Sequence, residues 1–145
     1  MKRSFAALVF LSVALPGAAL AELPRKPTPV EEFQVFWTNF RAAVLADRTD
    51  QVAEHTAFPF KTRGPVDSDP IVTHTKESFL KNFAKWINMD VGLSKEPESM
   101  RQYIERKTTV TVKDVSANGV GARVANFVFN KARGRWLFTM AYVEE

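Results

Sequence analysis

The residues of this chain that could act together in chemistry lie near its carboxyl end, where Asp114, Arg123 and Tyr142 combine a carboxylate, a guanidinium and a phenol. The surrounding pattern predicts that they sit side by side on three neighbouring strands, at one end of an apolar sheet face. Such a group could orient a small anionic or carbonyl ligand. It could equally be a rim ion pair with a tyrosine packed over the arginine stem, which contributes about 0 to 1 kcal/mol when exposed. Both interpretations are open.

The two histidines are the other candidates for chemistry. His55 or His74 could act as a general base if a carboxylate of the intervening loop, Asp67 or Asp69, lay within hydrogen-bonding distance. A structural alternative for His55 is a favourable cation at the C-terminus of a helix. The histidine spacing matches no metal motif, and without cysteine a zinc site would need two carboxylates, so we expect no metal and no cofactor.

The strands that would position these side chains are predicted from a pairing test on residues 108–145. Asn118-Gly119 is a strong indication of a two-residue type I′ turn, and residues 131–134 are interpreted as a four-residue loop. The resulting registers pair Phe127 with Val110 on one side and with Phe138 on the other. Alternation fixes register wherever one face of a sheet is buried. The predicted covered face consists of Val110, Val112, Ala125, Phe127, Phe129, Trp136, Phe138 and Met140.

The opposite face of the same strands is predicted to be half apolar, which is more than a fully solvated face needs. We therefore expect a homodimer contact there, with an ordinary surface rich in valine and threonine as the alternative. The residues assigned to this face are Thr109, Thr111, Lys113, Val124, Asn126, Val128, Leu137, Thr139, Ala141 and Val143.

Residues 1–21 have the three parts of a cleaved signal peptide: a basic start, an apolar run and a small-residue cleavage pattern. The run is shorter than the roughly 20 apolar residues that cross a bilayer, so no membrane anchor is expected. Removing Lys2 and Arg3 lowers the formal net charge from +4 to +2, because no acidic residue precedes Glu22. With no basic stripe interleaved with aromatics, nucleic acid is not an expected partner. The expected location is the periplasm.

After this leader, residues 22–29 hold three prolines and predict an extended lead-in, and residues 30–145 are expected to form one α+β domain. A helix is predicted from Val30 to about Ala46, with Thr28 as its N-cap and Pro29 at its first position. Its apolar stripe is interpreted as the cover of the aromatic sheet face. The stripe consists of Phe33, Phe36, Trp37, Phe40 and Val44.

Three further elements are predicted before the carboxyl-terminal strands. A short helix ends near His55, a strand spans residues 57–61, and Thr75 caps a third helix. Residues 98–106 could hold a helical turn or begin the first of the later strands, because their periodicity does not choose between the two. The buried stripe of the third helix is predicted to be Phe79, Leu80, Phe83, Ala84 and Ile87.

This order, α-α-β-α-β-β-β, predicts an α+β fold with helices packed on the concave face of a curved, mainly antiparallel sheet. Through the segments FQVFWTNFRAAVLADR, QVAEHTAFPFKTRG and FVFNKARGRWLFTMAYVEE, the chain resembles the nuclear transport factor 2-like (cystatin-like) superfamily. Ketosteroid isomerase and scytalone dehydratase share its cone-shaped fold. The resemblance covers essentially all of residues 22–145, and it implies a ligand cavity between helices and sheet and a homodimer contact through the outer face.

The residues expected to line such a site are Trp37, His55, Tyr103, Asp114, Arg123 and Tyr142. Our main hypothesis is a periplasmic, non-enzymatic domain that binds a small apolar or amphipathic ligand, or a protein partner. The alternative is a small lyase or isomerase that uses a His–Asp pair in the cavity. An isomerase of the ketosteroid type needs a protonated aspartate, whereas an arginine beside Asp114 would hold it ionised. In a third possibility, aromatic rings fill the cone and leave no cavity.

Overall fold

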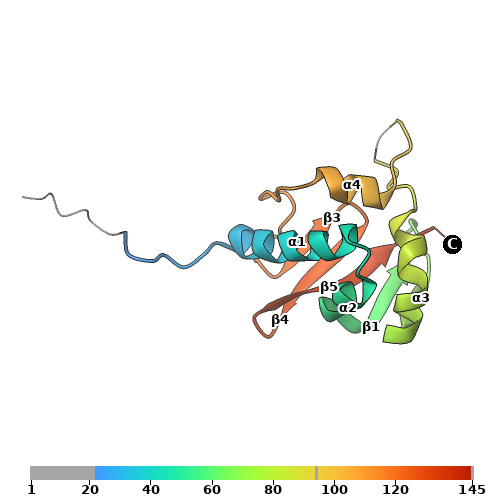
Figure 1. The fold of residues 1–145 in the computed structure, drawn as a ribbon, viewed down its shortest axis with the longest axis horizontal. Coiled ribbons are helices and arrows are strands. Elements are labelled where there is room, and N and C mark those ends of the chain that lie inside the picture. The colour runs from blue at the N-terminus through green and yellow to red at the C-terminus, as the bar shows by residue number, and fades with distance from the viewer. Residues whose placement is uncertain (1–21, 94, 145) are drawn as a thin grey trace, which may run out of the picture.

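The computed structural model describes residues 22–93 and 95–144, and it shows an α+β fold built on one five-stranded mixed sheet (Figure 1). The predicted signal peptide, residues 1–21, lies outside the described residues. The strand order is β2-β1-β5-β4-β3; β1 and β5 are parallel, and the other neighbours are antiparallel. The elements are α1 (Pro29–Leu45), α2 (Thr49–Glu54), β1 (Thr56–Arg63), β2 (Ile71–His74), α3 (Lys76–Ile87), α4 (Met100–Arg106), β3 (Gly121–Val124), β4 (Phe127–Ala132) and β5 (Arg135–Tyr142).

Helix α1 begins where the sequence predicts, because a capping box closes its first turn. The Thr28 hydroxyl accepts a hydrogen bond from the Glu31 amide at 3.3 Å, and the Glu31 carboxylate accepts one from the Thr28 amide at 2.8 Å. Pro29 occupies the first helical position, where its missing N–H costs nothing. Residues 22–28 have no regular secondary structure.

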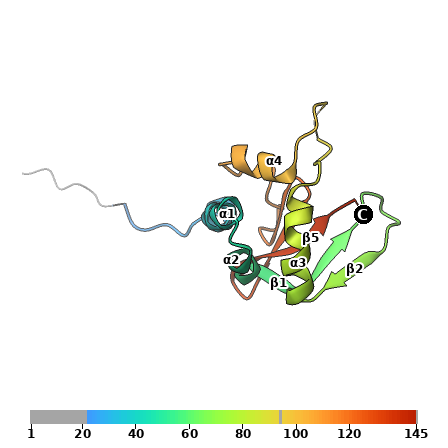
Figure 2. The same cartoon turned by 45° about the vertical axis from the view of Figure 1, so that its right-hand side comes forward.

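The core lies between the sheet and the helices α1 and α3, which run at a steep angle to each other in Figure 1 and are seen from another side in Figure 2. The aromatic stripe of α1 covers β4 and β5 as predicted: the rings of Phe33 and Trp136 lie 4.8 Å apart, and those of Phe40 and Phe138 lie 5.2 Å apart. From α3, Phe79 packs 5.0 Å from Phe60 of β1. The predicted aromatic face is therefore confirmed.

The first of the three predicted carboxyl-terminal strands does not form. The Asp114 carboxylate accepts hydrogen bonds from the Thr111 amide at 2.7 Å and from the Thr111 hydroxyl at 3.0 Å, which closes a turn where a strand was expected. Only an isolated bridge between Val115 and Ala122 remains of the predicted pairing. As a result Val112 is 78% exposed instead of covered, whereas Val110 is buried without being in a strand.

The segment predicted as the second strand forms two strands instead of one, because the chain reverses its direction at Ala125-Asn126. Strands β3 and β4 form a hairpin in which Val124 pairs with Phe127. Ala125 has φ +50°, a left-handed conformation that costs an alanine about 1–2 kcal/mol. Nothing in the local sequence predicts this conformation, because no glycine or asparagine stands at position 125. Val124 consequently lies in the core and not on the outer face.

The hairpin between β4 and β5 is tighter than predicted, with a two-residue turn, Arg133-Gly134, at φ +50° and +76°. This moves the register by two residues, so Phe129 pairs with Phe138 and the aromatic residues keep their face. Beyond Phe138 a bulge adds one residue to β5 and exchanges the faces. Ala141 is therefore buried in place of Met140, which was predicted to be covered.

Some of the remaining predicted positions also differ. Strand β2 is additional, and residues 100–106 form helix α4, which is the helical alternative for residues 98–106, so the observed order is α-α-β-β-α-α-β-β-β. In α3, Leu80 is 39% exposed and Ala84 is exposed, whereas Trp86 is buried against Phe60 at a ring distance of 5.6 Å. Val143 is buried as well, although it was assigned to the outer face.

We expect Ala125→Gly to stabilise the protein by about 0.5–1 kcal/mol, because glycine adopts positive φ without the steric cost of a Cβ. The matched control is Ala132→Gly, an exposed strand position at which glycine should lower stability by about 0.5–1 kcal/mol. Urea denaturation of both variants is the measurement. Equal destabilisation by the two substitutions would contradict the left-handed turn.

The contacts at the N-terminus of α1 predict how the stability of the protein depends on pH. Hydrogen bonds from Arg25 and from Thr28 lower the pKa of Glu31 to about 2. A carboxylate whose pKa is lower in the folded state stabilises that state above its unfolded pKa of about 4.3, and the contribution is lost as pH falls toward 2. Glu31→Gln should therefore reduce stability at neutral pH and flatten its decline over this acid range.

Thermal unfolding followed by circular dichroism from pH 7 to the acid range measures this effect. Glu54→Gln is the control, because the exposed Glu54 side chain makes no hydrogen bond to any described residue. A Glu31→Gln profile parallel to that of the unmodified protein at every pH would refute the assignment.

Candidate functional site

Two adjoining hollows of about 460 and 370 Å³ lie at the C-terminal end of β5. They share Pro65, Val143 and Glu144 in their walls, and we call them together the terminal groove. Their size is within the range of small-molecule sites. The other walls come from the end of β1, the loop between β1 and β2, the loop after α3, and the β3–β4 turn. Segments far apart in sequence therefore meet here.

The loop between β1 and β2 is held in shape by Asp69. Its carboxylate accepts a hydrogen bond from the Val66 amide at 2.9 Å, and its backbone carbonyl accepts one from Arg63 Nε at 3.1 Å. Gly64 lies so close that a Cβ there would come within 2.2 Å of the Asp69 carboxylate. Asp69 therefore shapes the groove wall and is not directed at a histidine, whereas Asp67 is exposed and lines the second hollow.

Arg123 and Tyr142 come together in the second hollow. The guanidinium carbon of Arg123 lies 4.6 Å from the centre of the Tyr142 ring, and its Nε donates to the Ala125 carbonyl at 2.9 Å. The Tyr142 amide in turn donates to the Asn126 carbonyl at 2.9 Å. The left-handed turn that the sequence did not indicate is thus what positions this pair.

Asp114 does not join this pair, although its backbone carbonyl accepts a hydrogen bond from the Arg123 amide at 2.8 Å. Its side chain instead lies 2.9 Å from Lys107 Nζ and also bonds Thr111. The Lys107 and Asp114 side chains are only 19% and 14% exposed. The grouping of three side chains is therefore wrong, because the ionic and turn contacts of Asp114 direct it away from Arg123.

Two other predicted site residues lie in the core and on α4. Trp37 is fully buried, and its Nε1 donates to the Lys107 carbonyl at 2.7 Å. Tyr103 lies beneath the guanidinium of Arg106, 4.4 Å from ring centre to carbon. Neither lines the terminal groove.

His55 lies at the end of α2, with its ring centre 5.7 Å from that of Phe36 and the two ring planes nearly perpendicular. Its carbonyl accepts a hydrogen bond from the Phe138 amide at 2.8 Å, which ties α2 to β5. No hydrogen bond joins its ring to a carboxylate in the described part of the chain. The structure therefore assigns His55 a packing contact.

His74 is buried between two hydroxyl groups. Its Nε2 lies 2.7 Å from Thr62 Oγ1, and its Nδ1 lies 3.1 Å from Ser78 Oγ. A hydroxyl can donate or accept, so either neutral tautomer is satisfied. Thr62 also lines the first hollow. The sequence analysis missed both hydroxyl residues; the only available indication was Ser78, one helical turn after His74 behind the Thr75 cap.

The space between α1 and the sheet is filled by rings with no exposed surface. These rings belong to Phe33, Trp37, Phe40, Phe129 and Phe138. The ring of Phe129 lies 5.2 to 6.0 Å from the rings of Phe33, Trp37 and Phe40. The candidate site is therefore at the end of the sheet and not beneath α1.

Across residues 22–93 and 95–144, no three histidine or acidic side chains gather closely enough to hold a metal ion. In the same ranges, no helix combines the length and the apolar character needed to cross a membrane.

A comparison of the chain with protein-family models, with curated proteins and with solved structures found no match. The fold and the site define a class: an α+β domain with a five-stranded mixed sheet and a groove of mixed polarity at the end of its central strand.

The packing of Gly64 against Asp69 yields a prediction about the groove wall. Gly64→Ala should lower stability by about 1–2 kcal/mol, because its Cβ displaces a carboxylate that satisfies the Val66 amide. In an Asp69→Ala background the same substitution should cost less than half as much, since the group it displaces is gone. Urea denaturation of the four proteins completes a double-mutant cycle.

Additive losses in that cycle would contradict the proposed contact. Amide exchange of residues 64–69 provides a local readout, because both single variants should accelerate exchange there and leave the amides of α1 unchanged.

Proposed function

We propose that this protein is a secreted, non-catalytic binding domain that takes a small amphipathic molecule in the terminal groove. The observation that carries the proposal is the position of the groove. It is an open hollow with mixed lining, whereas the space beneath α1 is occupied by buried rings. The leader-like sequence of residues 1–21 supports a periplasmic location.

The lining of the groove suits a molecule with an apolar part and a polar head. Val72 and Val143 offer apolar contact in the first hollow, and Met89 and Val91 offer it in the second. Apolar walls with a few placed polar groups are the usual composition of small-ligand sites. A short apolar tail would lie against these side chains, and its head would lie among the charged residues at the rim.

The charge of the rim favours a cationic head group. Two arginines, Arg63 and Arg123, line the groove, but the Nε of each already donates to a backbone carbonyl. Asp67, Asp90 and Glu144 contribute carboxylates, in addition to the Asp69 carboxylate that faces its own loop. A cleft with an excess of one sign of charge concentrates ligands of the opposite sign.

We also propose that the chain has a nuclear transport factor 2-like fold. Its support is a long amino-terminal helix against an aromatic sheet face and a closing hairpin with a basic glycine turn, Arg133-Gly134. The second hypothesis, a lyase or isomerase using a His–Asp pair, draws no support from the described contacts, because the His74 ring bonds two hydroxyl groups.

The test is a pair of probes with one tail and opposite heads, octylamine and octanoate, titrated into isotope-labelled protein. We expect octylamine to shift the amide resonances of the groove, at Val91, Arg123 and Val143, and to bind more tightly than octanoate. Val72→Trp should weaken binding and abolish the shift at Val143, because an indole fills the first hollow, which Val143 also lines. Thr73→Trp is the matched control: Thr73 pairs with Lys61 and faces the other side of β2.

Failure of both probes to shift groove amides would refute the groove as an amphiphile site. Equal loss of binding in both tryptophan variants would also refute it, because of the two substituted residues Val72 lines the first hollow and Thr73 does not.

A further inference from the structure

The outer face of the sheet is the side opposite the buried rings of Phe129 and Phe138. Cross-strand pairs assign its members: Lys61 faces Met140, and Asn130 faces Leu137. In Figure 1, α1 crosses in front of the sheet, on the other side. The members of this face on which the proposal depends are Pro59, Lys61, Val128, Arg135, Leu137 and Met140.

The centre of this face is hollowed and partly apolar. A hollow of about 250 Å³ lies across β1, β5 and β4, and Leu137 adjoins it through its pairing with Asn130. Val128, Met140 and Leu137 are half-buried, so their apolar surface is recessed instead of projecting. The hollow is lined by Ala57, Pro59, Lys61, Val128, Asn130, Thr139 and Met140.

The charge of the sheet is of one sign, because none of the five described strands contains an aspartate or a glutamate. Lys131 is turned to the helix side, where it pairs with Glu32 of α1. Lys61, Arg63, Arg123 and Arg135 remain on the outer face. Lys61 and Arg135 make no ion pair with a described residue.

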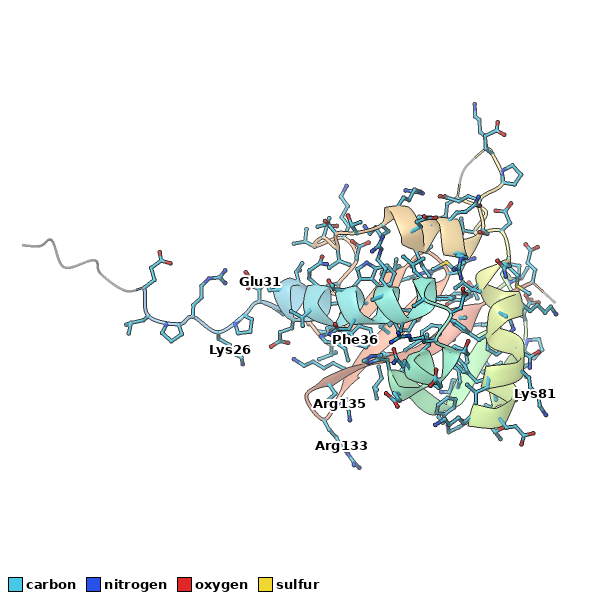
Figure 3. The ribbon with its side chains drawn as sticks, in the orientation of Figure 1. Lys26, Glu31, Phe36, Lys81, Arg133 and Arg135 are labelled. Atoms are coloured by element: carbon cyan, nitrogen blue, oxygen red, sulfur yellow. The ribbon has the colours of Figure 1, made fainter. Side chains whose placement is uncertain are left out.

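The basic character continues beyond Arg135 to the tip of the hairpin. Figure 3 shows the side chains of Arg133 and Arg135 directed away from the body of the protein. Both residues are exposed. Their charges are available to an approaching partner at little desolvation cost.

Two alternative occupants fit this surface poorly. A second copy packed face to face would bring cationic surfaces together, and like charges across an interface cost several kcal/mol. A lipid surface favours several apolar side chains that project into it, whereas Val128 and Met140 line a depression and only Ile71, beside Arg63 at the edge of the described sheet, projects. A depression of this size accepts a side chain from another protein.

We propose that the outer face binds an acidic segment of a partner protein. An apolar side chain of that segment occupies the hollow between Pro59, Val128 and Met140, and its carboxylates pair with Lys61 and Arg135. The residues that make these contacts do not line the terminal groove, although Arg63 and Arg123 border both surfaces. Complementary charge provides orientation and fast association, and burial in the hollow provides the apolar contact.

The probe is a short synthetic peptide in which glutamate alternates with leucine, titrated into isotope-labelled protein. We expect amide shifts concentrated at Lys61, Val128, Leu137 and Met140, and an affinity that falls as salt rises. The same peptide with lysine in place of glutamate should produce no shifts. Lys61→Glu with Arg135→Glu should weaken binding roughly tenfold or more, because attraction becomes repulsion at two contacts.

The control carries the same change in net charge on α3, as Lys76→Glu with Lys81→Glu, and should bind the acidic peptide within about twofold of the unmodified affinity, since distant exposed charges are screened. Circular dichroism establishes that both double variants fold. Val72→Trp should also leave peptide binding unchanged, which separates this surface from the groove.

Three outcomes would overturn the proposal. The first is equal weakening by the two double variants. The second is a stable dimer in light scattering that Met140→Glu dissociates, because the occupant would then be a second copy. The third is sedimentation with phosphatidylglycerol vesicles without any response to the acidic peptide, because the surface would then bind lipid.

Discussion

Phe138 is the residue on which the packing of all the layers depends. Its ring lies 4.5 Å from Phe127 of β4, 4.6 Å from Phe60 of β1 and 5.2 Å from Phe40 of α1. It also lies 6.2 Å from Phe79 of α3. Strand β5 is the central strand of the sheet, so one side chain connects both halves of the sheet to both covering helices. Close packing of this kind leaves no room for a ligand beneath α1.

Local polar contacts decide where the regular alternation of the strands ends. The Asp114 carboxylate turns a segment with strand-like alternation into a loop, since it satisfies the Thr111 amide within the turn. At the bulge of β5, the Thr139 hydroxyl hydrogen-bonds the Val128 carbonyl at 3.2 Å. Apolar alternation predicts which residues can be buried, but these side-chain hydrogen bonds compete with the ladder for the same backbone groups.

The distribution of charge divides the surface into two regions of different chemistry. The carboxylates that contact the sheet region come from loops and helices, where Asp67, Asp90 and Glu144 gather at the terminal groove. The charged residues of the strands are all cations: Lys61 and Arg135 lie on the outer face away from the groove, whereas Arg63 and Arg123 also line the groove. A ligand and a partner of opposite charge could therefore occupy the protein together, because the two regions attract different groups.

The start of α1, its aromatic stripe and the common face of Phe127, Phe129 and Trp136 could be predicted from the sequence, because capping and apolar periodicity are local properties. The predicted nearness of Arg123 and Tyr142 is also found, but it arises from the β3–β4 turn, because β4 lies between the strands of these two residues. Three features appear only in the folded structure: the left-handed conformation of Ala125, the pairing of Asp114 with Lys107, and the hollow at the end of β5. The hollow depends on contacts between segments distant in sequence, and the turns depend on side-chain hydrogen bonds that apolar alternation does not encode.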